Sequence, residues 1–232
     1  MTRVPAPAAT TARIDFAQPL DAAAPRLRCA FGAPRQLLVA QQVGEVRAVL
    51  DAVHAAAERG QWCVGYVRYE AAPAFDTALQ THAADGPLAW FAVHDAAQPW
   101  PAEELQEAAR VVWNSGLERS AFDAALGRIQ QAIGAGELYQ VNYTAPLTGV
   151  LQGSAAALFA ALQRAQPGGY AAHIDAGGEQ VLSVSPELFF DWQDVAGGGD
   201  ILARPMKGTA ARGATPEEDA AQAARLRTAP KE

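Results

Sequence analysis

Apolar residues recur at helical spacing in four segments of the chain. From Val46 to Ala57 an apolar residue stands at every third or fourth position and Gly60 follows, which is typical of an amphipathic helix and its stop. Pro216 and Glu218 behind Thr215 form a helix-start signal near the other end of the chain. The predicted helices are residues 44–59, Ser120 to the glycines at 134–136, residues 155–165, and Thr215 to about Arg227.

Short runs rich in β-branched and aromatic residues lie between these helices and predict strands. Two of them are separated by the turn sequence from Asp175 to Gly178, which predicts a hairpin. Residues 137–144 alternate strictly and place Gln140, Asn142 and Thr144 on one polar face. The predicted strands are residues 62–69, 88–93, 137–144, 170–174, 180–185, 188–192 and 201–204.

The order of these elements favours an α+β fold. Strands occur in runs broken by helices and not in regular βαβ alternation, so we expect an antiparallel β-sheet sandwich with helices on the outside. The chain has 232 residues, 50% of them hydrophobic, which is enough for a substantial core. Residues 1–25 are rich in Ala, Pro and Thr and show neither the helical nor the strand periodicity of apolar residues. They are expected to form a flexible lead-in.

The charge and cysteine content narrow the class of protein. The net charge of −7 argues against a surface built for nucleic acid or an anionic membrane, so an anionic ligand needs a local cluster of cations. Cys29 and Cys63 do not make a disulfide framework, and no apolar leader or run of membrane-spanning length is present. We therefore expect a soluble cytoplasmic protein.

Several common catalytic patterns are missing from the sequence. The four histidines lack the spacing of a zinc site, and the residues carry no Walker A loop and no nucleophile elbow. Glycines 134 and 136 match only the beginning of a dinucleotide fingerprint and precede a predicted strand instead of a helix. Because these patterns are missing, a zinc enzyme, a nucleotide-binding enzyme and a serine hydrolase are not the first hypotheses.

An unusual group of cations lies after the last predicted strand. Arg204, Lys207 and Arg212 fall within nine positions, and Gly208 permits a positive φ directly after the lysine. A lysine beside other cations and partly removed from water shifts toward its neutral amine, the form that acts as a nucleophile. The alternative is a solvated loop lysine with two unrelated arginines.

A single carboxylate stands at the junction of two predicted strands. Glu187 follows Ser185-Pro186 and precedes an apolar run. A carboxylate in such a place acts as a general acid or base if it is desolvated. It is equally explained as a loop glutamate bonded to nearby backbone amides.

Three ordered motifs resemble the chorismate-utilising enzymes, which include anthranilate, aminodeoxychorismate, isochorismate and salicylate synthases. The motifs are Glu137-Leu138-Tyr139-Gln140-Val141-Asn142-Tyr143-Thr144, Ser185-Pro186-Glu187-Leu188-Phe189 and Arg204-Pro205-Met206-Lys207-Gly208-Thr209. Residues 65–76 resemble the amino-terminal half of the aminodeoxychorismate synthase component I branch. The resemblance covers the chain from about residue 30.

The resemblance implies a reaction and two catalytic residues. In the aminodeoxychorismate branch the lysine matching Lys207 attacks C2 of chorismate, the 4-hydroxyl leaves, and ammonia then adds at C4. Anthranilate synthases typically have alanine there. Glu187 matches the acid/base residue of the family. The implied product is 4-amino-4-deoxychorismate, made for p-aminobenzoate and folate biosynthesis with ammonia from a glutamine amidotransferase subunit.

The resemblance also implies binding residues. Gly208 and Thr209 would shape the substrate pocket, and Arg204 would either offset the carboxylates of chorismate or pair with an acid of the protein. In the family a Ser-Pro-aromatic segment forms part of a tryptophan pocket. The matching segment here gives a candidate amino-acid pocket at Gly169, Tyr170 and Ala171, without the residues that indicate tryptophan regulation.

The family continues well beyond the motif region, so the chain resembles the amino-terminal half of such an enzyme. The expected regions are a lead-in over 1–25, an amino-terminal region over 26–113 and the first part of a chorismate-binding domain over 114–232. Mg²⁺ is the implied cofactor, and its ligands are expected in the other half. The alternatives are an anthranilate or isochorismate synthase, or a catalytically silent fragment that binds a partner or an amino acid.

Overall fold

The computed structural model describes residues 11–21, 23–102, 108–114, 116–195, 198–205 and 208–228. Every ladder between the described strands is antiparallel. The largest sheet has the order β10 (Gln180–Ser185), β9 (Tyr170–Asp175), β1 (Ala12–Phe16), β2 (Leu27–Phe31) and β6 (Gln98–Pro99). A three-stranded sheet has the order β3 (Gln36–Ala40), β5 (Ala89–His94) and β4 (Trp62–Val67).

Two further sheets contain two strands each. These are β7 (Arg110–Trp113) with β8 (Gly149–Gln152), and β11 (Leu188–Val195) with β12 (Gly198–Arg204). The α-helices are α1 (Val46–Glu58), α2 (Arg119–Gly134), α3 (Ala155–Ala165) and α4 (Pro216–Thr228), and the short 3-10 helices are η1 (Val43–Glu45) and η2 (Tyr69–Ala74).

The five-stranded and three-stranded sheets share a hydrophobic core. Phe31 of β2 is fully buried and belongs to one cluster with Ile14 of β1 and Trp90 of β5. Because side chains alternate along a strand, Trp90 faces this core, whereas Ala89 belongs to a second cluster on the other side of its sheet. The two sheets therefore pack face to face.

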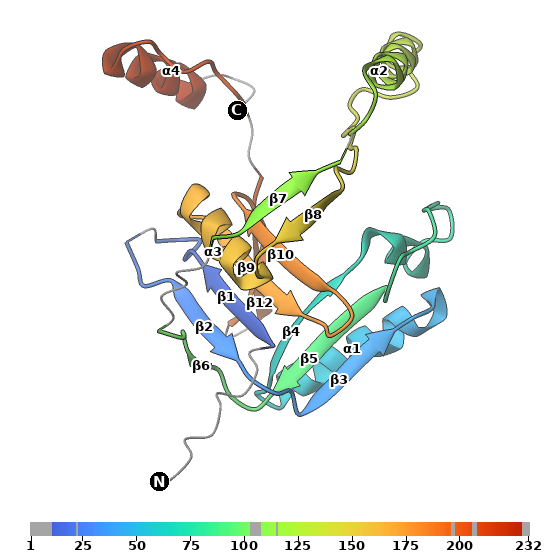
Figure 1. Cartoon of the computed structure of the whole chain (residues 1–232), viewed down its shortest axis with the longest axis vertical. Coiled ribbons are helices and arrows are strands. Elements are labelled where there is room, and N and C mark those ends of the chain that lie inside the picture. The colour runs from blue at the N-terminus through green and yellow to red at the C-terminus, as the bar shows by residue number, and fades with distance from the viewer. Residues whose placement is uncertain are drawn as a thin grey trace.

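A helix covers the outer face of each of these sheets (Figure 1). The apolar side of α1 packs against the three-stranded sheet through Val46 and Val49. On the other side Phe159 of α3 is 1% exposed, and its ring lies 5.4 Å from the His173 ring of β9. The expected mixture of helices and antiparallel sheets, with helices outside, is confirmed at this level.

The strand β1 corrects the expectation of an irregular lead-in for residues 12–16. It lies in the middle of the five-stranded sheet, between β2 and β9. Ala12, Ile14 and Phe16 alternate with charged residues, so one face of the strand is apolar and packs in the core. The sheet thus combines strands from both predicted regions of the chain, while residues 1–10 lie outside the described part.

All four predicted α-helices are present, with ends close to the predicted ones. The predicted cap of α4 forms: Thr215 Oγ1 accepts from the Glu218 amide at 3.2 Å, and the Glu218 carboxylate accepts from the Ala214 amide at 2.9 Å. The predicted hairpin of β9 and β10 and the pair β11–β12 are also present. The strand after Gln61 ends earlier than predicted, at Val67, because η2 with Pro73 follows.

Residues 137–144 do not form the predicted strand. Within the described chain no ladder includes them, and Tyr139 is 90% exposed. An alternating sequence becomes a strand only where a neighbouring edge accepts its backbone hydrogen bonds. Gln140, Asn142 and Thr144 accordingly lie in exposed coil and do not form the polar face of a strand.

An ion-pair network joins the β9–β10 hairpin to the three-stranded sheet. The hydroxyl of Tyr66 donates to Glu179 Oε1, and Arg68 Nη2 donates to Glu179 Oε2. Arg68 Nε also donates to the Pro87 carbonyl at 3.0 Å. Burial and the hydrogen bond to Glu179 raise the pKa of Tyr66 to about 12, and the bonds from Tyr66 and Arg68 lower the pKa of Glu179.

The Tyr66–Glu179–Arg68 network predicts a pH-dependent contribution to stability. Replacing Glu179 with Gln removes the charge from both hydrogen bonds, and we expect the free energy of unfolding at pH 7 to fall by about 2 kcal/mol. The pKa of Glu179 in the folded state is depressed below its ordinary value of 4.5. The destabilisation caused by Glu179→Gln is therefore fully present above pH 4.5, and it disappears as the pH falls through the lower pKa of the folded state. Urea unfolding across this range measures the difference.

The exposed Glu137→Gln is the matched control, and we expect it to change the free energy of unfolding by less than about 0.5 kcal/mol at each pH. A Glu179→Gln deficit that stayed constant from pH 7 down to pH 3 would contradict the role of the ionised carboxylate.

Candidate functional site

The strands β11 and β12 bring two separated motifs side by side. Leu188, the first residue of β11, is paired with Arg204, the last residue of β12. Glu187 therefore precedes one strand where Pro205 follows the other. The register of this ladder explains why Leu188 and Arg204, which are 16 positions apart, meet in space.

Glu187, Leu188 and Pro205 line a pocket of about 430 Å³, here called the motif pocket. Its lining residues are Ser185, Glu187, Leu188, Phe189, Ala203 and Pro205. The motif pocket holds the predicted acid/base residue Glu187, and its wall ends at Pro205 of the cationic motif. Lys207 lies outside the described residues, so its expected role stays a prediction.

The backbone of Glu187 is fixed by the serine of its own motif. Ser185 Oγ accepts from the Glu187 amide at 3.2 Å and donates to the Glu187 carbonyl at 2.9 Å. Such hydroxyl–backbone bonds hold a turn in one conformation. The side chain of Glu187 is exposed at the mouth of the motif pocket.

Gly208 has a φ of +71°, the left-handed conformation that glycine permits directly after the lysine. A side chain at this position would be strained, so the turn requires glycine. Thr209 follows and is exposed. The substrate-binding roles expected for these two residues stay predictions.

Two arginines near the cationic motif have partners within the protein. The Arg204 guanidinium donates to the Pro19 carbonyl. Arg212 forms an ion pair of 2.6 Å with Asp219 near the start of α4. Because Lys207 lies outside the described residues, the expected cluster of Arg204, Lys207 and Arg212 stays a prediction.

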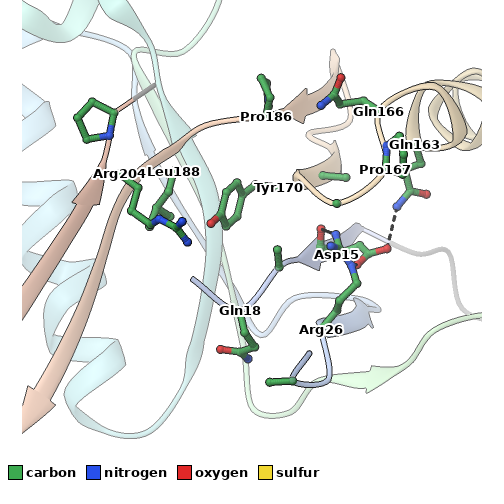
Figure 2. Close-up of a pocket in the computed structure, with 15 residues that line it drawn as sticks. Asp15, Gln18, Arg26, Gln163, Gln166, Pro167, Tyr170, Pro186, Leu188 and Arg204 are labelled. Carbon is green, nitrogen blue, oxygen red and sulfur yellow. Dashed lines mark hydrogen bonds and ion pairs between the residues drawn. The ribbon is translucent and has the colours of Figure 1, made fainter. Parts of the chain in front are cut away.

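A second pocket, of about 790 Å³, is lined by Arg204 and shares Leu188 and Pro205 with the motif pocket (Figure 2). We call it the hairpin pocket, because Tyr170 and Ala171 of β9 line it. Figure 2 shows the Tyr170 ring between Arg204 and Asp15. Its other lining residues are Ala17, Gln18, Ala24, Arg26, Gln163, Gln166, Pro167, Gly168, Pro186, Leu188 and Pro205.

Gly169 permits the close backbone contact beneath the hairpin pocket. A Cβ built on Gly169 would lie 2.3 Å from the Ser185 carbonyl oxygen, which is a severe overlap. Its own carbonyl accepts from Arg26 Nη2 at 2.7 Å. Of the predicted amino-acid pocket, Tyr170 and Ala171 line the hairpin pocket and Gly169 directly precedes them, whereas the binding of an amino acid there stays a prediction.

Sequence reasoning missed Asp15 and Arg26, which form a wall of the hairpin pocket. Arg26 Nε donates to Asp15 Oδ1 at 2.5 Å, and Gln163 Nε2 donates to Asp15 Oδ2 at 3.3 Å. The signal that identifies β1 was present in the sequence, since apolar and charged residues alternate strictly from Ala12 to Phe16. This alternation covers only five residues, and the flanking Ala-, Pro- and Thr-rich sequence shows no strand pattern, so the segment alone did not predict a strand.

Comparison with known proteins gives the family. The family model of the chorismate binding enzymes matches residues 92–232, more than half of the chain. This chain belongs to that family. The match includes both motifs of the motif pocket and the β9–β10 hairpin. No solved structure matches the chain significantly.

Curated relatives carry two kinds of name. Aminodeoxychorismate synthase component 1 of Klebsiella aerogenes is 35% identical over 120 residues, which are 52% of this chain and 26% of the relative. Aminodeoxychorismate synthase of Streptomyces griseus is 37% identical over 115 residues, 50% of this chain and 16% of the relative. An anthranilate synthase component 1 of Haloarcula marismortui is 32% identical over 112 residues, 48% of this chain and 22% of the relative.

Each of these matches covers about a quarter of the relative or less. The family is therefore shown, and the individual member of it is not. Among the helices that the structure describes, none combines the length and the apolar composition needed to cross a membrane.

The close contact at Gly169 predicts the effect of one added methyl group. Gly169→Ala forces the Ser185 carbonyl away, and we expect a loss of about 2 kcal/mol in the free energy of unfolding. Gly178→Ala is the matched control, because a Cβ there meets nothing within 4 Å and the residue lies in the same hairpin. Thermal unfolding of the two variants checks this. Equal stability of both would show that the β9–β10 backbone adapts freely.

Proposed function

We propose that this chain is part of an aminodeoxychorismate synthase component I, a transferase-type enzyme that converts chorismate and ammonia to 4-amino-4-deoxychorismate. The supporting observation is the family membership together with a lysine at position 207 of the motif from Arg204 to Thr209. A primary amine there favours amination at C4, whereas the alanine typical of anthranilate synthases does not form an adduct.

The proposed reaction proceeds in two displacements. The Lys207 amine forms a bond to C2 of chorismate, both conjugated double bonds of the ring shift, and the C4–O bond breaks. Ammonia then forms a bond to C4, both double bonds shift back, and the C2–N bond to the lysine breaks. Dividing one difficult displacement into two easier ones is the usual gain from a covalent intermediate.

Glu187 is the proposed general acid. In the first step Glu187 donates a proton to the departing 4-hydroxyl, which leaves as water, and the carboxylate takes the proton released by the lysine adduct. In the second step Glu187 returns a proton to the departing lysine, which is released as a neutral amine. The Ser185 hydrogen bonds hold the backbone of Glu187, which supports its place in the lining of the motif pocket. The adjoining position of Pro205 supports a common site for both motifs.

Roles are also proposed for the remaining binding residues. Gly208 and Thr209 are proposed to shape the substrate site beside Lys207. Arg204, which lines the hairpin pocket, is proposed to lower the electrostatic cost of the substrate carboxylates. An amino acid is the proposed ligand of the hairpin pocket at Gly169, Tyr170 and Ala171.

The described residues offer no site for the implied magnesium ion. Among them no group of three or more His, Cys, Asp or Glu side chains is arranged to hold a metal. Mg²⁺ needs several oxygen ligands in near-octahedral geometry, which a lone Glu187 does not supply. We therefore assign no step to the metal, and we propose that its ligands come from a further part of the protein.

Large apolar side chains mark where that further part is proposed to pack. Phe189, Trp192 and Ile201 of β11–β12 and Trp113 of β7 are each at least 60% exposed. Exposed apolar surface of this kind is typical of an interaction face. We propose that the rest of the domain completes an anthranilate synthase-like sandwich here, and that a glutamine amidotransferase supplies ammonia in p-aminobenzoate synthesis.

The lysine distinguishes the proposed branch in a direct assay. The protein expressed from the whole reading frame is incubated with chorismate, Mg²⁺ and an ammonium salt, and the product is identified by mass and ultraviolet spectrum. We expect 4-amino-4-deoxychorismate. Lys207→Ala is expected to lower its rate of formation by a factor of about 10³ or more, because the covalent route is lost.

Lys231→Ala, at another lysine of the chain, is the control and keeps the wild-type rate. An unchanged rate in Lys207→Ala would contradict the nucleophile, and anthranilate as the wild-type product would favour the second candidate, an anthranilate synthase, which relatives such as the Haloarcula marismortui protein support.

A further inference from the structure

A third pocket, of about 320 Å³, lies between α3 and the outer face of the five-stranded sheet. The sheet contributes Arg13 and Asp15 of β1 and Arg28 of β2, and the helix contributes its side that carries Phe159 and Arg164. The other lining residues are Trp100, Pro101, Ala156, Ala160 and Gln163. We call it the arginine pocket.

The described lining of the arginine pocket is mainly cationic in an acidic protein. Among the lining residues that the structure describes, Arg28 and Arg164 stand against a single carboxylate, that of Asp15. Arg13 also lines the pocket but is only 8% exposed, so the positive charge offered to a ligand comes from Arg28 and Arg164. The chain as a whole has a formal charge of −7.

The carboxylate of the arginine pocket is already committed to other partners. Asp15 accepts from Arg26 at 2.5 Å on the side of the hairpin pocket, and from Gln163 at 3.3 Å. The oxygen that accepts from Gln163, Oδ2, also lies 3.6 Å from Arg28 Nε. Since Arg26 shares this carboxylate, Arg28 and Arg164 leave an excess of positive charge among the described lining residues.

The geometry of the strands directs these guanidinium groups to one place. Asp15 and Arg28 are opposite each other in the β1–β2 ladder, and Arg13 is two residues from Asp15 on the same face. The Arg28 guanidinium lies 4.5 Å from the centroid of the Trp100 ring. Stacking on an aromatic ring keeps a guanidinium planar and leaves its edge donors directed outward.

Part of the arginine pocket is apolar. Phe159 and Trp100 supply aromatic surface, and the alanines of α3 add small aliphatic walls. A volume of about 320 Å³ is several times that of a simple oxyanion and is near the lower end for organic ligands. The walls therefore suit a ligand with a compact organic body beside its charges.

We propose that the arginine pocket binds a small organic dianion, a phosphate monoester or a dicarboxylate, with its oxyanion groups on Arg28 and Arg164 and its organic body against Trp100 and Phe159. Guanidinium forks bind both kinds of oxyanion through paired hydrogen bonds. The arginine pocket shares only Asp15 and Gln163 with the hairpin pocket and no residue with the motif pocket, so this site is distinct from the proposed chorismate site.

The test is isothermal titration calorimetry of this chain at low ionic strength. Phenyl phosphate represents phosphate monoesters, phthalate represents dicarboxylates, and neutral benzamide reports binding of the ring alone. We expect one of the two dianions to bind in the submillimolar range and benzamide to bind far more weakly. The tighter dianion identifies the class of natural ligand.

Arg28→Gln and Arg164→Gln remove the charges without disturbing the core, since both side chains are exposed. We expect each to weaken dianion binding about tenfold, the loss of one charged hydrogen bond. Arg225→Gln is the matched control, because it too removes an exposed arginine from the last turn of a helix. It should leave the dissociation constant unchanged.

Arg204→Gln distinguishes the arginine pocket from the hairpin pocket, and dianion affinity should survive it. The proposal is overturned if neither dianion binds, if benzamide binds as tightly as they do, or if Arg28→Gln and Arg164→Gln both keep the wild-type affinity. A loss of affinity confined to Arg204→Gln would move the ligand to the hairpin pocket and likewise overturn it.

Discussion

The pairing of β1 with β9 is the constraint on which the other features depend. Five residue pairs from Ala12–Ile174 to Phe16–Tyr170 join the beginning of the chain to the centre of its second half. The ladder fixes which face each residue of β1 presents. Its apolar residues complete the core between the two large sheets, and its charged residues face α3.

This alternation places two pockets on one side of the sheet. Asp15 belongs to the walls of both the hairpin pocket and the arginine pocket, and Arg26 approaches it from one of them. The motif pocket lies beyond, where β11 begins and β12 ends. The chemistry-bearing motifs are thus held at the end of a hairpin whose other end is bound to the three-stranded sheet by Glu179.

The sequence predicts local features of this fold well. Helix α1 follows from its 3.6-residue period, and the β9–β10 hairpin follows from a turn at Asp175 to Gly178, because both signals lie within a dozen residues. The left-handed Gly208 is likewise a local requirement. Family motifs add the placement of Glu187 beside Pro205, which no periodicity indicates.

Features that depend on distant partners escape such reasoning. Residues 137–144 alternate as well as any strand of the protein, yet the described chain offers them no edge to pair with. Residues 12–16 alternate as well, and they become a central strand because β2 and β9 flank them. The ion pair of Arg212 with Asp219 likewise depends on α4, a helix that begins after the motif.

The β1–β9 ladder also constrains the order of events during synthesis. Ala12 and Ile174 are paired although 162 positions separate them, whereas the three-stranded sheet and α1 are built from residues 36–94 alone. During synthesis the three-stranded sheet and α1 can therefore form first. The edge of β1 that pairs with β9 stays unpaired until β9 has left the ribosome. The hairpin pocket and the arginine pocket form only when β1 has paired with β9. Their ligands can therefore bind only after this long-range pairing is complete.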